Sequence, residues 1–518
     1  MNKIEGLKAE RDGLDVRDAI ARYAQTGWES ITEDDVQRLK WYGLFLRNPT
    51  PGFFMVRVRI PNGITSSYQL RALATIAKTH GNSVIDLTTR QQVQLRHIPI
   101  ESVPAIFDAL EAVGLTTLQT GMDNIRNIMG CAVAGLSPTE IFDASTVVKA
   151  FTDHFVGNRE FTNLPRKFNV VVTGCPENCL HAETQDLALV PSECHLGDRK
   201  EIGFNVLIGG KLGSGGYRIA SPLNVFVRPA EAVEVCAAIV LLYRDFGNRE
   251  LRTQNRLAFM VDEWGEARFR GEVETRLGRT LLPAGMDLRK PGRNEHGGVF
   301  RQKQQGLNYV GLKVAVGRIT AEHVLEIAAL AERYGTGEIR ISPSQTLIVP
   351  NIPDRRLGNF LEEPLLMVLP YNASEVFKGL VSCVGNDYCN LALIETKSRA
   401  LMIARHLEGT LKGVKPITMH WSGCPAGCGN HLVADIGLLG KRVKVDGEVV
   451  DAVDVYVGGR SGPNAKVAVK ILEDVPCDKL PAVLEGLVPY HTREKLHRGG
   501  RGKTAKPLAA MTGVQSAS

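Results

Sequence analysis

The chain has 518 residues, of which 44% are hydrophobic and 23% are charged, and its formal net charge is +6. This composition is sufficient for two or three packed domains and excludes a low-complexity chain. The mild positive charge favours an anionic substrate or an acidic partner, because a nucleic-acid-binding protein is usually more strongly basic.

The N-terminal stretch MNKIEGLKAERDG lacks the apolar run of a secretory signal, and no stretch of about 18 apolar residues predicts a membrane span. We therefore expect a cytoplasmic protein with no membrane contact and no nucleic-acid partner. Ten cysteines in so long a chain are too sparse for a disulfide scaffold. Clustered cysteines are accordingly expected to be ligands or catalytic groups.

The stretch FFMVRVRIPNG and the residues after it predict a strand, a helix and a second strand. Phe54, Val56 and Val58 alternate at strand period, and Leu70 and Leu73 recur at helical spacing. The stretch TTRQQVQLRHI then has the pattern of a closing strand.

The same order of elements returns about 250 residues later, in YVGLKVAVGRIT and the residues after it. Gly81 matches Gly335, and GGKLG at Gly209 matches GGRSG at Gly458. Such self-similarity indicates an internal duplication, and two copies of one unit commonly pack about a pseudo-two-fold axis.

The segment between the copies, from Pro229 to about Gly278, predicts helices around AEAVEVCAAIVLLYRDF and NRLAFMVDEWGEARF. A Pro/Gly-punctuated linker near PAGMDLRKPGRNEHGG follows. The C-terminal stretch HTREKLHRGGRGKTAKPLAAMTGVQSAS is polar, basic and non-periodic, which predicts disorder.

The second copy contains four closely spaced cysteines: Cys383, Cys389, Cys424 and Cys428. They form a C-x5-C pair followed by a C-x3-C pair, and four thiolates are what a [4Fe–4S] cubane requires. Tetrahedral zinc is an alternative, although structural zinc sites favour C-x2-C or C-x4-C pairs. Buried thiols without a metal are the other alternative.

The first copy keeps three thiols. Our sequence alignment places Cys131 opposite Cys389 and Ile125 opposite Cys383, and the pair Cys175 and Cys179 in GCPENC repeats the GCPAGC pair. Three thiols do not ordinarily hold a cubane, so we expect buried structural cysteines here, of which one near an active site could still tune it. The isolated cysteines are also expected to be structural: Cys194, Cys236 and Cys477.

The first copy also carries basic groups that the second copy lacks. In the alignment three positions differ in this way: Arg90 against Ser344, Arg126 against Val384, and Lys167 against Pro416. If the copies face each other, a cluster on one side meets a cationic wall on the other, which suits an anionic substrate reduced beside an electron source. Each basic group alone could instead be solvated or salt-bridged at the surface.

The motifs TTRQ, GMDNIRN, LPRKFN, C-x5-C, GCPxxC and GGR, in this order, resemble the sirohaem- and iron–sulfur-containing nitrite and sulfite reductases. The similarity runs from about Arg38 to about Cys477. Within the family, KGLVSCVGNDYCNLALIETKSRAL and HWSGCPAGC are most similar to the ferredoxin-dependent assimilatory nitrite reductases. The resemblance implies an α+β fold that is internally duplicated, with ferredoxin-like half-domains and two larger cofactor-binding domains.

The domain division that follows from this resemblance has six parts. They are a helical extension (1–45), a first ferredoxin-like half-domain (46–115), a first domain on the sirohaem and substrate side (116–285), a second ferredoxin-like half-domain (300–365), a second domain with the cluster cysteines (370–490), and a disordered basic tail (491–518).

The resemblance further implies two cofactors and their ligands. Cys383, Cys389, Cys424 and Cys428 would hold the [4Fe–4S] cluster, and the Cys428 sulfur would also be the axial ligand of the sirohaem iron. The other face of that iron would be open to substrate.

The basic residues take roles from the same resemblance. Arg90, Arg126 and Lys167 would line the substrate side and offer charge-assisted hydrogen bonds to an oxyanion. Lys167 is the best proton donor among them, since arginine stays charged. Arg96 and Lys303 would bind sirohaem carboxylates.

The choice between nitrite and sulfite depends on one position. Sulfite reductases of this family typically have a second lysine in an R-K-F-K run, whereas this chain has Arg166-Lys-Phe-Asn169. The resemblance implies that Asn169 is the nitrite-type residue. Our physical hypothesis is that sulfite, with its higher negative charge, gains more from an extra ammonium than nitrite does. The bacterial-type first-half cysteines leave this preference open.

The implied activity is the assimilatory six-electron reduction of nitrite to ammonium. No separate flavin or nicotinamide domain is recognisable, and GGKLGSGG is weak as a phosphate loop. Reduced ferredoxin or a similar small acidic carrier is therefore the expected donor, and we expect a monomer.

Three alternatives remain from the sequence. An assimilatory sulfite reductase would prefer sulfite over nitrite. A precorrin-hydroxylating enzyme would act on a tetrapyrrole with oxygen, although such chains are typically shorter. A non-catalytic iron–sulfur redox protein would purify without sirohaem.

Overall fold

A computed structural model describes residues 2–213 and 215–497, with side chains through His491. The last helix, α13 (Leu480–His497), continues past the point where the sequence predicted a disordered tail to begin. The boundary at residue 491 was therefore wrong, because the helical turn pattern continues through the polar stretch HTREKLH. The rest of that predicted tail, residues 498–518, lies outside the described residues.

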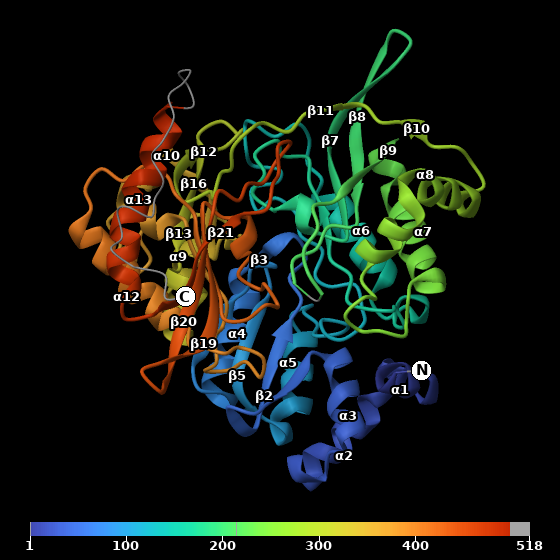
Figure 1. The fold of residues 1–518 in the computed structure, drawn as a ribbon, viewed down its shortest axis with the longest axis horizontal. Coiled ribbons are helices and arrows are strands. Elements are labelled where there is room, and N and C mark those ends of the chain that lie inside the picture. The colour runs from blue at the N-terminus through green and yellow to red at the C-terminus, as the bar shows by residue number, and fades with distance from the viewer. Residues whose placement is uncertain (1, 214, 498–518) are drawn as a thin grey trace.

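The chain begins with short helices that join the two large parts of the first copy (Figure 1). They are α1 (Lys3–Glu10), α2 (Arg17–Thr26) and α3 (Glu33–Arg38). Lys8 on α1 forms a buried ion pair with Asp123 at 3.3 Å. The predicted helical extension therefore packs against the body of the protein.

The two repeated strand–helix–strand units form two sheets with the same order of elements. The first unit comprises β1 (Leu44–Arg47), β2 (Thr50–Val58), β3 (Ile64–Ser66), α4 (Ser67–His80), β4 (Val84–Leu87), β5 (Val93–Pro99) and α5 (Val103–Glu111). The second unit comprises β12 (Gly298–Arg301), β13 (Leu307–Lys313), β14 (Arg318–Thr320), α9 (Ala321–Tyr334), β15 (Glu338–Ile341), β16 (Thr346–Pro353) and α10 (Asp354–Leu361).

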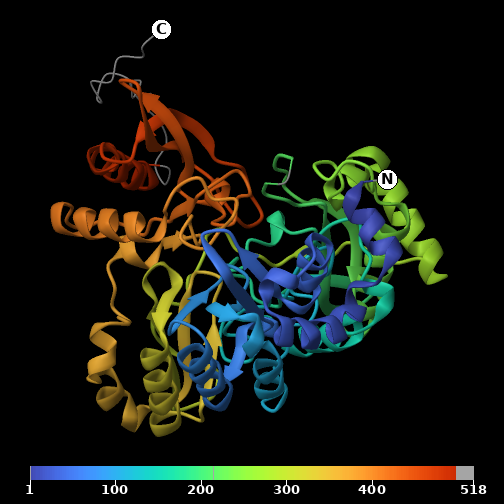
Figure 2. The same cartoon turned by 90° about the horizontal axis from the view of Figure 1, so that it is seen from below.

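Each unit donates one short strand to the sheet of the other. The strand orders are β1-β2-β5-β4-β14 and β12-β13-β16-β15-β3. Helices α4 and α9 pack together, and one hydrophobic core includes Leu73 from the first unit and Ile327 from the second. The two half-domains are therefore one pseudo-symmetric body, as Figure 2 shows from below.

Two larger domains lie on either side of this body (Figure 1). The first contains α6 (Ser145–Phe155), β6 (Val170–Val172), β7 (Leu187–Leu196), β8 (Arg199–Ile208), β9 (Ser221–Val227), α7 (Ala232–Phe246), α8 (Leu257–Leu277), β10 (Leu282–Pro283) and β11 (Met286–Asp287). The second contains α11 (Glu375–Lys378), β17 (Leu380–Ser382), α12 (Lys397–Thr410), β18 (Met419–Ser422), β19 (Ile436–Val445), β20 (Glu448–Val457), β21 (Val469–Pro476) and α13.

The two larger domains share a sheet pattern that confirms the predicted duplication. In each domain short parallel strands lead into an antiparallel meander, β6-β7-β8-β9 in the first and β17-β18-β19-β20-β21 in the second. The parallel strands end at the cysteine-containing loops. The α+β class predicted from the sequence is confirmed.

Matching glutamines show which positions of the two copies correspond. Gln91 Nε2 donates to Gly130 O at 3.0 Å, and Gln345 Nε2 donates to Ser382 O at 3.0 Å. Gly130 and Ser382 therefore occupy the same place, and so do the cysteines that directly follow them.

A second pair of hydrogen bonds gives the same offset between the copies. Ile141 N donates to Gly174 O at 2.9 Å, and Leu393 N donates to Gly423 O at 2.8 Å. The chain between these two fixed points has the same length in both copies, so no gap separates the corresponding residues.

The cysteine alignment made from the sequence was therefore wrong. Cys131 corresponds to Cys383, and Ser137, not Cys131, stands where the second copy has Cys389. The sequence alignment paired Cys383 with Ile125, which lies six residues before its true counterpart, Cys131. The true register follows from hydrogen bonds between residues far apart in the chain, which the sequence does not display.

The same shift changes the counterpart of Arg126. Counting back without a gap from Cys131 places Lys378, not Val384, opposite Arg126. Lys378 lines a cavity together with Pro416, the counterpart of Lys167. The second copy thus keeps one positive charge that the sequence alignment had counted as lost.

Candidate active site

The four second-copy cysteines lie on two loops at the ends of β17 and β18. Cys383 directly follows β17, and its Sγ accepts a hydrogen bond from Gly423 N at 3.1 Å. Cys389 Sγ accepts from Leu391 N at 3.4 Å. Backbone N–H groups that point at sulfur stabilise a thiolate and are one means of setting the potential of an iron–sulfur cluster.

The spacing of these thiols suits a cluster better than a single ion. Among the described residues, no three of the four Sγ atoms belong to a group of ligand atoms within 4.8 Å of one another. Burial raises the pKa of the Cys424 thiol to about 11, with a smaller contribution from Cys428. Metal binding would remove the protons of such thiols, because metal binding and deprotonation are coupled.

Basic side chains of the first copy gather beside Cys428. Burial lowers the pKa of Arg57 to about 9, and the neighbouring Arg47 and Arg90 lower it further. Burial likewise lowers the pKa of Lys167 well below its usual value, with additional repulsion from Arg90. In both residues the nearby Cys428 acts in the opposite direction. The protein alone therefore leaves this positive charge poorly compensated.

The uncompensated charge provides a test of whether sirohaem fits here. Several arginines of the first copy have a buried Nε atom without a hydrogen-bond partner among the described residues, and they include Arg47, Arg57, Arg126 and Arg166. Arg57 and Arg126 donate to backbone carbonyls through other nitrogens, and of these four only Arg166 lies near a carboxylate of a described residue, 3.9 Å from Asp123. Buried positive charges with few carboxylate partners are unfavourable, so a set of this kind favours an anionic ligand. A macrocycle with many carboxylates meets that requirement, and the residues present fit the group.

The predicted substrate residues are held from several elements. Arg126 donates through Nη1 to Thr120 O at 3.0 Å and through Nη2 to Met122 O at 2.8 Å. Lys167 Nζ has no hydrogen-bond or ion-pair partner within the described part of the chain. A lysine that is half-buried and unpaired is free to bind a ligand.

Asn169 is positioned by a buried ion pair. Its backbone N donates to Asp186 Oδ2 at 2.8 Å, and Asp186 in turn accepts two hydrogen bonds from Arg256 at 2.6 and 2.9 Å. The Asn169 Oδ1 atom is buried and unbonded to any described residue. The amide therefore keeps hydrogen-bonding capacity for a ligand.

The two copies meet where the cluster loop contacts the TTRQ loop. Thr89 Oγ1 donates to Cys428 O at 3.0 Å, and Arg90 is the next residue. The pKa of Arg90 is lowered by burial and raised by Cys428. The structure thus brings Arg90, Lys167 and Cys428 together, although they come from opposite halves of the chain.

A glycine-rich loop of each copy packs against the cysteine loop of the other copy. Gly213 of GGKLGSGG has φ +74°, and a Cβ there would collide with the carbonyl oxygen of Ala426 in the GCPAGC loop. Gly462 of GGRSG has φ +94°, and a Cβ there would lie 2.7 Å from Asn178 Nδ2 in the GCPENC loop. Each glycine loop therefore covers the cysteine loop of the other copy, as expected for a backbone turn and not for a phosphate loop.

The two residues predicted to bind sirohaem carboxylates have other partners. Arg96 is buried and pairs with Asp86 at 2.7 Å, which leaves its Nη1 unbonded among the described residues. Lys303 Nζ pairs with Glu140 at 2.6 Å, and its backbone N donates to Leu136 O near the first-copy cysteines. Arg96 keeps one free donor, whereas the described contacts of Lys303 give no support for a sirohaem role.

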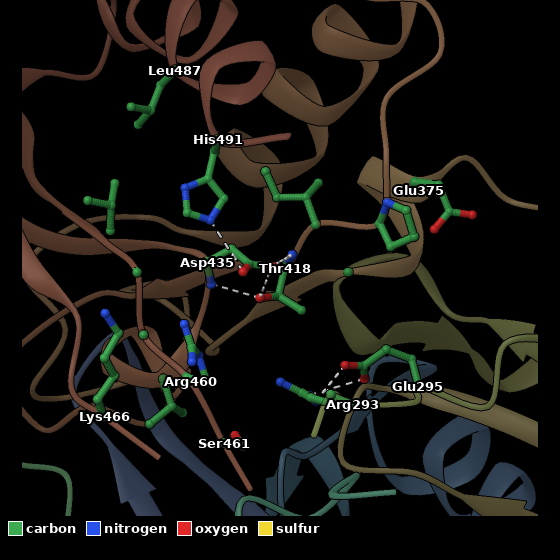
Figure 3. A pocket seen from close by; sticks show the side chains of 18 of the residues that line it. Arg293, Glu295, Glu375, Thr418, Asp435, Arg460, Ser461, Lys466, Leu487 and His491 are labelled. Carbon is green, nitrogen blue, oxygen red and sulfur yellow. Dashed lines mark hydrogen bonds and ion pairs between the residues drawn. The ribbon is translucent and has the colours of Figure 1, made fainter. Parts of the chain in front are cut away.

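A cavity of about 1290 Å³ is lined by the second copy and the linker that precedes it. Figure 3 shows side chains that line this cavity. Thr418 N donates to Asp435 Oδ2 at 2.9 Å, which repeats the contact between Asn169 and Asp186. His491 lies 3.3 Å from Asp435 Oδ1 in the same cavity. The cavity is lined by Lys378, Pro416 and Thr418, the counterparts of Arg126, Lys167 and Asn169, so it is the pseudo-symmetric counterpart of the predicted substrate site.

Comparison with known proteins places this site in a family. The model described as the nitrite/sulfite reductase ferredoxin-like half domain matches residues 47–113 and 300–367, and the nitrite and sulphite reductase 4Fe-4S domain matches residues 121–281. The ferredoxin–nitrite reductase of Synechococcus elongatus is 45% identical over 94% of this chain and 96% of its own length. The chain belongs to the nitrite and sulphite reductase family.

Further relatives extend this membership. The chloroplastic ferredoxin–nitrite reductase of Zea mays is 42% identical over 94% of this chain and 89% of its own length. The solved structure of the Mycobacterium tuberculosis NirA protein has a TM-score of 0.88 and 30% identity, covering 98% of this chain and 95% of that one. The predicted cofactors, sirohaem and a [4Fe–4S] cluster, are confirmed by the family membership.

Sequence reasoning missed some of the basic residues. Arg47 and Arg57 lie on β1 and β2, where a charged residue at strand period usually points to solvent. Their only sequence signal is their position beside apolar strand residues.

No helix in the described part of the chain is long and apolar enough to cross a membrane.

Proposed function

We propose that this protein reduces nitrite to ammonium with electrons from reduced ferredoxin: NO₂⁻ + 6 e⁻ + 8 H⁺ → NH₄⁺ + 2 H₂O. Relatives named ferredoxin–nitrite reductase, 42–45% identical over 94–95% of the chain, support this activity. The observation that carries it is the contact of Thr89 with Cys428, which joins the cationic wall to the cluster loop. When bound, the cofactors supply the electrons and the iron that holds the substrate.

We assign the cluster ligands to Cys383, Cys389, Cys424 and Cys428, with Cys428 shared with sirohaem. The Nε atoms of Arg47 and Arg57, which have no hydrogen-bond partner among the described residues, join Arg96 Nη1 as candidates for the sirohaem carboxylates. Arg47 and Arg57 have the stronger case, because Arg96 is already paired with Asp86.

The substrate contacts are assigned to four residues: Arg90, Arg126, Lys167 and Asn169. The two arginines orient nitrite through charge-assisted hydrogen bonds to its oxygens. Lys167 donates protons, since it has no partner among the described residues and burial lowers its pKa below the usual value. Asn169 adds a hydrogen bond without adding charge.

The direct test is a comparison of kcat/KM for nitrite and sulfite with anaerobic holoprotein and reduced viologen. We expect a preference for nitrite of about 100-fold or more, equivalent to roughly 2.7 kcal/mol. Equal rates or a sulfite preference would instead indicate sulfite reduction on the same cofactors.

Asn169→Lys is expected to lower the nitrite/sulfite ratio of kcat/KM by about 10-fold, roughly 1.4 kcal/mol. The added ammonium benefits the more highly charged sulfite more than nitrite. The matched control is Asn464→Lys, at an exposed position. An unchanged ratio in Asn169→Lys would show that this position does not set the preference.

An external donor has access to the second-copy thiols. Cys428 is exposed and the other three are half-buried, whereas the first-copy thiols are buried.

Both halves of the site belong to a single chain, which supports a monomer, and light scattering coupled to size exclusion tests this. We place the reaction in the cytoplasm.

The ferredoxin-driven rate is expected to fall several-fold between 0.05 and about 0.3 M NaCl, because salt screens attraction between an acidic carrier and a basic face. The viologen-driven rate at the same salt concentrations is the control and should change little. A ferredoxin rate that does not depend on salt would contradict electrostatic docking.

A further inference from the structure

The first-copy cysteines are joined by a histidine from a distant segment. Cys131, Cys175 and Cys179 are 2%, 3% and 4% exposed, and His296, from the linker between the copies, is 1% exposed. This histidine gave no motif in the sequence. The four side chains therefore form a closed cluster, unlike the open second-copy site.

The distances among three of these four side chains fit one metal ion. Cys131 Sγ lies 3.7 Å from His296 Nε2, and the ligand atoms of Cys131, Cys179 and His296 all lie within 4.8 Å of one another. Cys175 falls outside this group at 4.8 Å, but its thiol interacts electrostatically with the Cys131 and Cys179 thiols and lies beside them as the fourth candidate ligand. Tetrahedral zinc with bonds of about 2.3 Å to sulfur and about 2.0 Å to nitrogen separates its ligand atoms by roughly 3.6–3.8 Å.

A [4Fe–4S] cubane fits these distances less well. Its thiolates lie on the outside of a four-iron core, so their sulfurs are farther apart than ligands of a single ion. The second-copy thiols show this wider spacing in the same structure, since no three of them fall within 4.8 Å. In the first copy, Ser137 also stands where Cys389 provides the fourth thiol.

The buried imidazole of His296 points independently to a ligand. Its Nδ1 has no hydrogen-bond partner among the described residues, and its Nε2 has only the weak contact with the Cys131 thiol. Burying an imidazole without partners costs free energy, which a metal–nitrogen bond would offset.

The linker is held so that it presents this histidine to the cysteines. Lys290 N donates to Pro176 O at 2.9 Å, and Asn294 N donates to Glu177 O at 3.2 Å. Asn294 Nδ2 also donates to Glu177 Oε2 at 2.6 Å. These contacts attach the linker, just before His296, to the part of the GCPENC loop between Cys175 and Cys179.

We propose that Cys131, Cys175, Cys179 and His296 bind a structural Zn²⁺ ion that fastens the linker between the copies to the first-copy cysteine loop. Four protein ligands in a buried site leave no open position for a substrate, which is the pattern of a structural zinc site. The thiols lose their protons as the ion binds. The duplicated cysteine loop thus holds a cluster in one copy and a single ion in the other.

The first measurement is the metal content of the purified holoprotein by mass spectrometry. We expect about one zinc per chain beside about five irons, four from the cluster and one from sirohaem. About nine irons without zinc would overturn the proposal in favour of a second cluster. About six irons without zinc would replace zinc by a single iron, and about five irons without zinc would leave only buried thiols.

Zinc K-edge absorption then tests the ligands without interference from sirohaem. We expect three sulfurs at about 2.3 Å and one nitrogen at about 2.0 Å. A shell of nitrogen and oxygen alone would indicate adventitious zinc and overturn the assignment. This measurement uses the unaltered protein, so the test remains decisive if variants fail to fold.

Variants locate the ion in the chain. Cys131→Ser and His296→Gln are each expected to reduce zinc at least about 10-fold after dialysis, consistent with a loss of affinity on removing one ligand. Iron is expected to stay near its wild-type content. Cys194→Ser, at a buried cysteine on β7, is the matched control and should retain zinc. Undiminished zinc in both ligand variants would place the ion elsewhere.

Discussion

Replacing Cys428 with serine is expected to lower kcat/KM for nitrite at least about 1000-fold, a loss of roughly 4 kcal/mol of transition-state stabilisation. Serine oxygen is a poor ligand for iron in a sulfur cluster, so the cluster loses one of its four thiolates. The same substitution removes a thiolate that would also help to hold sirohaem. The measurements are the viologen-driven rate, the visible absorption and the iron content of the purified variant.

Cys477→Ser is the matched control for this prediction, because Cys477 is a buried cysteine of the same domain that lies in its hydrophobic core. It should keep the iron content and the visible spectrum of the wild type. A Cys428→Ser variant with the full spectrum and more than a tenth of the wild-type rate would contradict the shared-ligand assignment. Circular dichroism on both variants separates cofactor loss from general unfolding.

The duplication and the cluster loops were predictable because their signals are local. Strand and helix periodicity, the GCPxxC pairs and the four closely spaced thiols each lie within short stretches of sequence. The exchange of β3 and β14 between the two sheets was not predictable in this way. It depends on pairing between residues such as Thr320 and Val84, which are far apart in the chain.

The correspondence between the copies shows a different limit. Aligning Cys131 with Cys389 paired two cysteines by residue type alone. The hydrogen bonds of Gln91 and Gln345 show instead that Cys131 corresponds to Cys383. A loop tolerates shifts that a strand does not, so residue identity is a weak guide to register there.

The ion-pair partners of buried charged residues were also not predictable from the sequence, because the partners are distant in the chain. Arg96 looked like a ligand of an anionic cofactor, but its partner Asp86 also pairs with Arg318 at 3.0 Å and lies 3.6 Å from Lys397. These cations hold the pKa of Asp86 well below its usual value, against the opposing effect of burial. His296 was missed for a related reason, since a single histidine in a Pro/Gly-rich linker has no spacing signal.

Lys167→Met is expected to lower kcat/KM for nitrite by about 100- to 1000-fold. Loss of a charge-assisted hydrogen bond to the substrate accounts for roughly 1.5–3 kcal/mol, and loss of a positioned proton donor accounts for the rest. The matched control is Lys149→Met on the exposed face of α6, which should retain the wild-type rate. A Lys167→Met variant within about threefold of the wild type would exclude a direct role for this ammonium.

The pH profile separates proton donation by Lys167 from simple charge. Only the protonated amine donates, so kcat/KM should fall as the pH rises through the Lys167 pKa, which burial and Arg90 lower from 10.5. In Lys167→Arg the positive charge persists at every relevant pH, so this alkaline limb should disappear while much of the substrate affinity remains. If Lys167→Arg keeps both the wild-type rate and the limb, another group titrates, and Lys167 acts only as a fixed charge.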